Sequence, residues 1–112
     1  MSRLAYESHK SDGVVRLALT GEFDLSNASV VEDVLREIED EGPQVLVLDL
    51  RDLTFMDSTG LRVMVAADAR ARDGSRRLAI VQGPEAVHRV FRIALLDGRL
   101  EFVEPNGEGG IP

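Results

Sequence analysis

The chain has 112 residues and no cysteine, and its 20 acidic against 13 basic side chains give a formal net charge of −7. This length predicts one domain, and the lack of cysteine excludes disulfides, thiolate metal sites and thiol nucleophiles. The basic side chains form no cluster beyond Arg76-Arg77, which argues against nucleic acid or an anionic membrane as a partner. With no run of about 18 apolar residues and no secretory signal, we expect a cytoplasmic protein.

The first half of the chain predicts a hairpin followed by a helix. Residues 6–20 are predicted to form a hairpin with its turn at Ser11-Asp12-Gly13, because apolar residues alternate along 15–20 after the turn, and residues 21–24 are expected to break the second strand. Helical spacing over residues 26–41 predicts an amphipathic helix, with Ser26 as its N-cap or a capping box that starts at residue 29. Its apolar stripe consists of Val31, Val34, Leu35 and Ile38.

The second half alternates strands and helices. Residues 45–50 are almost continuously apolar, which predicts a central strand that is covered on both faces, and a loop is expected over 51–56. A helix is predicted from Asp57 or Ser58 to about residues 73–74. A strand over 78–81 and a helix that opens at Gly83-Pro84 follow, and residues 100–103 form either a last short strand or a helix-capping segment.

The predicted order is therefore β-β-α-β-α-β-α-β. Such alternation is typical of an α/β fold in which three or four helices pack on a parallel or mixed sheet. We assign residues 1–104 to this domain and expect residues 105–112 to be a disordered tail.

The segment Asp57-Ser58-Thr59-Gly60 is the most informative place for chemistry. It follows a strand and opens a helix, where several backbone N–H groups lack partners and the helix dipole is positive. A hydroxyl at such a position is usually exposed, and a phosphate added to it would meet those donors and change the local charge by about −1.5 to −2. The alternative is that Asp57 or Ser58 is a helix cap and nothing more.

Several segments together resemble a known family. They are residues 19–24 (LTGEFD), residues 45–53 (VLVLDLRDL), residues 55–61 (FMDSTGL) and residues 84–91 (PEAVHRVF). In this order and spacing, over about residues 3–104, the chain resembles the anti-sigma-factor antagonists. These are built on the sulfate-transporter and anti-sigma-factor-antagonist (STAS) domain.

This resemblance implies a phosphorylation switch. Ser58 matches the serine that, in the family, a partner phosphorylates, and that partner is both an anti-sigma factor and a serine kinase. The unphosphorylated antagonist binds the anti-sigma factor and so frees a sigma factor, and a serine phosphatase resets the switch. ATP belongs to the partner kinase, so no cofactor is expected here. The partner-binding residues that the resemblance implies are Asp24, Ser26, Asp57, Ser58, Thr59, Gly60 and Arg62.

The sequence also offers a physical reason for such a switch. A phosphate on Ser58 would lie beside Asp57, and the family fold would bring Asp24 close as well. Burying an unpaired charge costs several kcal/mol, so a local electrostatic and steric block needs no large conformational change. Arg62 departs from the family pattern, and it either pairs with a phosphate on Ser58 or is a solvated helix residue.

Two other interpretations stay open at this stage. The domain could be a scaffold or regulatory subunit of another signalling assembly, or a small hydrolase that uses Ser58 with His88 and an aspartate. We expect His88 at the surface or at the core boundary, and no metal site, because neither histidine has ligands at metal spacing. The acidic face of the helix over 26–41 is expected to be solvated, and the oligomeric state is left between monomer and weak dimer.

Overall fold

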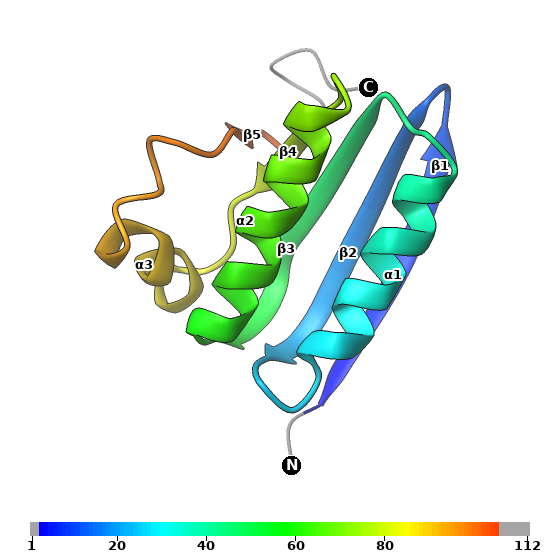
Figure 1. Ribbon diagram of the computed structural model, residues 1–112. Helices are drawn as coiled ribbons and strands as arrows, with labels where there is room; N and C mark the ends of the chain where they lie inside the picture. Colours follow the sequence, from blue (N-terminus) through cyan, green and yellow to red (C-terminus); the bar gives the residue numbers. More distant parts are fainter. Residues whose placement is uncertain (1–2, 106–112) are drawn as a thin grey trace.

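The computed structural model describes residues 3–105, which form a five-stranded sheet with helices on one side (Figure 1). In chain order the elements are β1 (Leu4–Ser11), β2 (Val14–Phe23), α1 (Ala28–Asp40), β3 (Val45–Met56), α2 (Ser58–Asp73), β4 (Arg77–Val81), α3 (Glu85–Ile93) and β5 (Phe102–Val103). The strands lie side by side in sequence order, β1 antiparallel to β2 and all others parallel. This confirms the predicted mixed α/β fold, and the tail expected over 105–112 lies, except for its first residue, outside the described residues.

The hairpin is confirmed, but the expected break of its second strand is wrong. Asp12 and Gly13 both have positive φ, 50° and 81°, as the tight turn of a hairpin requires. Beyond it, β2 continues to Phe23 because Gly21, at φ 104°, lets β1 run close alongside. A Cβ at Gly21 would lie 2.3 Å from the carbonyl oxygen of Arg3, so only glycine fits here.

The loop predicted over 51–56 is also wrong, because these residues extend β3 to Met56. The parallel pairing with β2 continues to its end, where Phe23 lies opposite Met56. Two irregularities in the register, between Ala18 and Thr20 and between Gly21 and Glu22, disturb the alternation of buried and exposed side chains. The polar residues of this segment lie on exposed positions of a strand, and their pattern therefore looked like a loop.

Helix α1 begins two residues later than predicted, and Ser26 is not its N-cap. Asn27 occupies that position without a side-chain capping bond, and no capping box forms there, while the Ser26 hydroxyl donates to Asp24 Oδ1 at 2.6 Å. The buried stripe matches the prediction except that Val34 is only half-buried. It consists of Ala28, Val31, Leu35 and Ile38.

The other helices follow the prediction closely. Helix α2 ends at Asp73, before Gly74, and Pro84 caps α3 from the position just before its first residue. His88 on α3 is buried, which contradicts its expected place at the surface or the core boundary. Its ring packs against Phe91 and, edge-on at 4.9 Å between centroids, against Phe102 of the short β5. None of the helices within residues 3–105 is long and apolar enough to cross a membrane.

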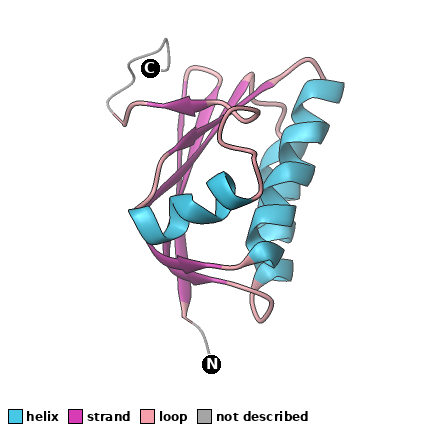
Figure 2. Ribbon diagram, turned by 90° about the vertical axis from the view of Figure 1, so that its left-hand side faces the viewer, coloured by secondary structure: helices cyan, strands magenta, loops and turns pink. Residues whose placement is uncertain are grey.

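Helices α1 and α2 cover one face of the sheet, as the edge-on view in Figure 2 shows. The main hydrophobic core fills the space between these layers and includes residues of β2, β3 and all three helices. On the opposite face Val47, Ala79 and Val81 form a second, small apolar cluster. Strand β3 is therefore buried on both faces over residues 46–50, which explains its continuous apolar sequence.

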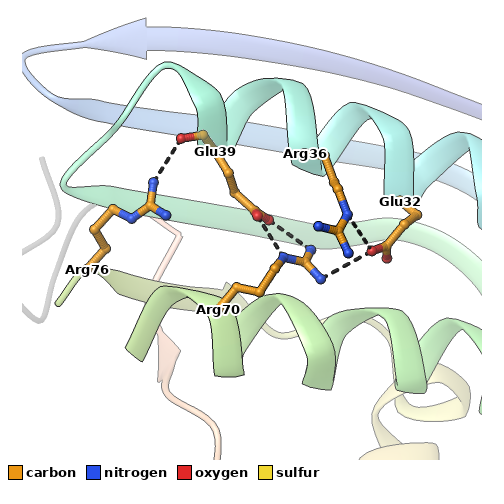
Figure 3. A network of polar contacts seen from close by, with 5 residues as sticks. All are labelled: Glu32, Arg36, Glu39, Arg70 and Arg76. Carbon is orange, nitrogen blue, oxygen red and sulfur yellow. Dashed lines mark hydrogen bonds and ion pairs between the residues drawn. The ribbon is translucent and has the colours of Figure 1, made fainter. Parts of the chain in front are cut away.

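A charged network joins the two long helices (Figure 3). The guanidinium of Arg70 on α2 donates to both carboxylate oxygens of Glu39 at 2.7 and 2.9 Å, and to Glu32 at 3.1 Å. Arg76 donates to the backbone carbonyl of Glu39 at the end of α1. Two members of the acidic face expected to be solvated therefore hold α1 against α2, and bidentate pairing fixes their geometry as well as adding energy.

Replacing Arg70 by alanine should lower the free energy of unfolding by about 1–3 kcal/mol, because the half-buried Glu39 carboxylate loses both of its guanidinium hydrogen bonds and Glu32 keeps only Arg36. The matched control is Arg36→Ala, which removes a more exposed ion pair with Glu32 and should cost well under about 1 kcal/mol. Urea unfolding followed by circular dichroism measures both. Equal losses in the two variants would contradict the proposed role of Arg70.

A second charged cluster lies on the sheet face opposite the helices. The buried carboxylate of Asp49 accepts hydrogen bonds from the Arg51 side chain at 2.7 and 3.0 Å and from Arg16 at 3.3 Å. Burial raises the pKa of Asp49, but the hydrogen bonds of Arg51 and the charges of both arginines outweigh it. Together they hold the pKa below its ordinary value of 3.8.

Because its pKa is lower in the folded than in the unfolded state, ionised Asp49 stabilises the fold above about pH 4, and this contribution is lost as the pH falls through the folded-state pKa. The free energy of unfolding of Asp49→Asn should therefore lie below that of the unmodified protein by a constant amount near neutral pH. The difference should shrink below about pH 4. Urea titrations at a series of pH values measure it, and a difference independent of pH would contradict this account.

Candidate functional site

The candidate site lies where β2 and β3 end side by side. The two strands are parallel, so their carboxyl ends, at Phe23 and Met56, lie next to each other. The chain leaves both strands at this place. The backbone N–H of Asp57 donates to the carbonyl of Phe23 at 3.3 Å. This bond places the loop that begins at Asp24 beside the start of α2, as the resemblance implied.

Asp57, and not Ser58, caps helix α2. One carboxylate oxygen, Oδ1, accepts the backbone N–H groups of Thr59 at 2.9 Å and Gly60 at 3.2 Å. Ser58 is therefore the first residue of the helix and its side chain is exposed. The capping function that competed for this serine is carried out by its neighbour, which leaves the Ser58 hydroxyl at the surface.

This cap changes one expectation. A phosphate on Ser58 was expected to meet the unpaired N–H groups at the helix start, but Asp57 already occupies those of Thr59 and Gly60. A phosphate would therefore meet the carboxylate of Asp57 beside it. Two of the donors that were expected to favour a phosphate at the helix start are therefore already occupied.

The loop at Asp24 is held by its own hydrogen bonds. Asp24 Oδ1 accepts the backbone N–H of Ser26 at 2.9 Å in addition to the Ser26 hydroxyl. Asn27 closes the loop, since its side chain accepts the Asp24 N–H at 3.0 Å and donates to the carbonyl of Glu22 at 2.8 Å. Ser26 thus shapes the loop through Asp24 instead of starting the helix.

Gly60 is where α2 approaches the sheet most closely. A Cβ there would lie 2.8 Å from the Met56 side chain and 3.1 Å from the ring of Phe23, so a larger residue would push the helix start away from both strand ends. Leu61 is buried in the core, as the sequence predicted. Arg62 is exposed, lies one turn beyond Ser58, and makes no ion pair within the described residues.

Two exposed apolar side chains near the site were missed by the sequence reasoning. Leu25 lies in the loop between Asp24 and Ser26 and is 76% exposed, and Phe55, at the end of β3, is 47% exposed. A leucine between polar loop residues is a signal that could have been noticed. Phe55 could not be identified, because its segment was assigned to a loop and its orientation follows from the irregular pairing with β2.

The hydrolase interpretation finds no support in this geometry. His88 Nδ1 is buried and has no hydrogen-bond partner in the part of the chain that the structure describes, and the ring packs between two phenylalanines. No hydrogen bond between the described residues joins it to Ser58. A nucleophilic serine needs a base within hydrogen-bond reach. Residues 3–105 also contain no group of three or more side chains that could hold a metal ion.

The fold and the site define a class of α/β domain that presents an aspartate-capped serine at a helix start, beside a shaped loop. Comparison with known proteins gives the family. Residues 7–104 match the family model described as "Mlab, STAS domain", and the chain belongs to the STAS domain family.

Its relatives include regulators of sigma factors. The chain is 34% identical over 86 residues to the anti-sigma-F factor antagonist RsfB of Mycobacterium tuberculosis, covering 77% of this chain and 70% of RsfB. It is 30% identical over 94 residues to the anti-sigma-B factor antagonist of Listeria monocytogenes, covering 84% and 82% of the two chains.

The fold also matches solved structures. SpoIIAA, an anti-sigma factor antagonist of Bacillus, has a known structure in two forms. Its unphosphorylated form aligns with a TM-score of 0.78 at 17% identity, covering 91% of this chain and 90% of SpoIIAA. Its phosphorylated form aligns with a TM-score of 0.71 at 16% identity, covering 91% and 94%. At this identity the likeness concerns the fold alone.

Replacing Asp57 by alanine should remove both capping bonds and lower the free energy of unfolding by about 1 kcal/mol. Asp57→Asn keeps an acceptor oxygen and should cost less. The control at the other end of the same helix is Asp73→Ala, which should cost nothing because a carboxylate is unfavourable near a helix C-terminus. Thermal and urea unfolding measure the three variants, and an unchanged stability of Asp57→Ala would contradict the cap.

Proposed function

We propose that this protein is an anti-sigma-factor antagonist that is switched by phosphorylation of Ser58. In its unphosphorylated form it binds an anti-sigma factor, and a sigma factor is thereby released. The observation that carries the proposal is the exposed Ser58 hydroxyl at the start of α2, freed from capping by Asp57 and lying beside the loop at Asp24. The names of the relatives support the same function.

The proposed docking surface combines polar and apolar groups at the ends of β2 and β3. Its apolar members are Leu25 and Phe55, whose exposed side chains would be covered by a partner. Large side chains that become buried at the centre of an interface carry much of its binding energy. The polar members are Asp24, Ser26, Asp57, Ser58, Thr59 and Arg62, and Gly60, which is buried, sets the position of the helix start beneath them.

Phosphorylation would block docking through local charge. The dianion would lie next to the Asp57 carboxylate, whose Oδ1 is already bonded to the helix start, with Asp24 on the adjoining loop. A partner that covers this surface would have to desolvate these negative groups, at a cost of several kcal/mol. Since about 1.4 kcal/mol corresponds to a tenfold change in affinity, the modification would weaken binding by orders of magnitude without refolding the domain.

The remaining components of the cycle would come from other proteins. The anti-sigma factor would itself be the serine kinase and would bring ATP, while a serine phosphatase would restore the hydroxyl. The antagonist supplies the substrate serine and the docking surface, so the state of one side chain determines which complex the anti-sigma factor forms.

The test is to mix the purified protein with the anti-sigma factor kinase of its own organism and ATP, and to measure intact mass. One phosphate is expected, on Ser58, and none in Ser58→Ala. Ser58→Ala should keep its affinity for the kinase, whereas Ser58→Asp should bind at least about tenfold more weakly. Thr59→Ala, at the neighbouring hydroxyl, is the control and should still be labelled.

Labelling at another residue, or equal affinities of Ser58→Ala and Ser58→Asp, would overturn the proposal. A crystal structure of the phosphorylated protein provides an independent check. A rearranged α2 or a displaced Asp24 loop in that structure would contradict the local electrostatic block, even if Ser58 is the modified residue.

A further inference from the structure

Strand β1 is an unusually open edge of the sheet. It is eight residues long, pairs only with β2 among the described strands, and has exposed side chains at every position except the half-buried Leu4. In Figure 1 it forms the outer border of the sheet, on the side of α1. A long edge strand of this kind is a template for pairing with another chain unless something covers it.

The backbone of β1 offers a regular row of hydrogen-bonding groups on its outer side. The N–H of Glu22 donates to the carbonyl of Arg3 at 2.7 Å, and the register with β2 is unbroken from Leu4 to Ser11. Hydrogen-bonded and non-hydrogen-bonded pairs alternate along an antiparallel ladder. The odd-numbered residues therefore bond to β2, and the backbone groups of Leu4, Tyr6, Ser8 and Lys10 point outward.

Apolar side chains lie next to this edge on the helix side. Tyr6 lies opposite the buried Leu19 of β2, on the face that the helices cover, and is 48% exposed. On α1, Glu32 and Glu39 face α2, so the opposite flank, which carries Val30 and the half-buried Val34, faces the β1 side. Val30 is also 48% exposed, so apolar surface accompanies the open backbone groups.

We propose that β1 pairs antiparallel with β1 of a second copy of this chain, around a two-fold axis at Ser8, to form a dimer with one continuous sheet. An axis perpendicular to the sheet places the helix layers of both copies on the same side. Tyr6 and the Val30 flank of α1 then face the partner. Such an isologous contact closes after two copies and does not propagate.

The charges on β1 select this register. With Ser8 opposite the partner's Ser8, the outward backbone groups meet and Glu7 lies opposite the partner's His9, twice by symmetry. Shifting the axis by one residue towards the N-terminus sets Glu7 against the partner's Glu7, and shifting it the other way sets His9 against the partner's His9. The imidazole N–H of His9 donates to the Glu7 carboxylate in this register, whereas two Glu7 carboxylates in directly opposing positions would repel each other and destabilise the strand pair.

Lys10 is the lysine of this edge strand, and its side chain pairs with a residue of its own chain. A lysine on an edge strand usually discourages pairing. Lys10, however, forms an ion pair with Glu41 at the end of α1 in its own chain. The candidate site at the ends of β2 and β3 is built from other strands, so a dimer through β1 leaves both Ser58 side chains accessible.

The test is sedimentation velocity of the full chain over a range of concentrations. The unmodified protein should show a reversible monomer–dimer equilibrium. Glu7→Lys removes the carboxylate that accepts from His9, and His9→Glu places two carboxylates opposite each other twice, so each should raise the dimer dissociation constant about tenfold or more. The double variant Glu7→Lys/His9→Glu places a lysine opposite a glutamate twice and should recover the dimer.

The control is Asp73→Lys, which changes the net charge by the same amount as Glu7→Lys but far from β1 and should leave the equilibrium unchanged. Circular dichroism verifies that each variant is folded, and the double variant tests the contact even if a single variant is unstable. A protein that stays monomeric up to its solubility limit overturns the proposal. So does a dimer that is insensitive to the two single substitutions, or one that the double variant fails to restore.

Discussion

The parallel pairing of β2 with β3 is the constraint on which the site depends. It continues through two irregularities to the pair Phe23 and Met56, so the chain leaves both strands at one place. The bond from the Asp57 N–H to the Phe23 carbonyl then joins the two exits, and Gly60 lets α2 start directly over them. Ending β3 at residue 50 would leave Ser58 on a loop of undefined position relative to Asp24.

Several acidic side chains of this protein hold the fold together. Glu32 and Glu39 hold Arg70 between the long helices, Asp49 is bound by two arginines on the opposite sheet face, and Asp57 caps α2. The net charge of −7 is therefore a poor guide to how this protein meets a partner. What matters at the site is the placement of one carboxylate next to one exposed hydroxyl, because salt screens the interaction between exposed charges that lie more than about 8–10 Å apart.

The molecule separates two kinds of surface. The ends of β2 and β3 carry the switchable serine, while β1 offers backbone groups along the side of the sheet. If both surfaces are used, a dimer would present two docking sites on one rigid sheet, and a partner that is itself dimeric would gain from their linkage. Phosphorylation of Ser58 would then leave the dimer contact unchanged, and dimerisation would leave Ser58 accessible.

The sequence by itself determined the element types, their order and the serine at a helix start. The spacing of apolar residues, the glycines and the turn residues are local features of the sequence. They predict the same helix or strand whatever element packs against its apolar face. Tertiary structure alone decided the length of β3, since the polar residues over 51–56 form a strand only because β2 lies beside them. It also decided the burial of His88, which depends on the distant Phe102, and the pairing of Glu39 with Arg70, which lies 31 residues away.

The same division holds within the site. The sequence could identify Asp57 and Ser58 as competitors for the capping position, but only the tertiary structure shows that Asp57 accepts the N–H groups and leaves the serine hydroxyl exposed. Ser26 was misassigned because capping preference is a property of residue type, whereas the cap used depends on where the loop places each side chain. Which groups lie together in space follows from strand pairing between distant segments, and no local pattern in the sequence contains it.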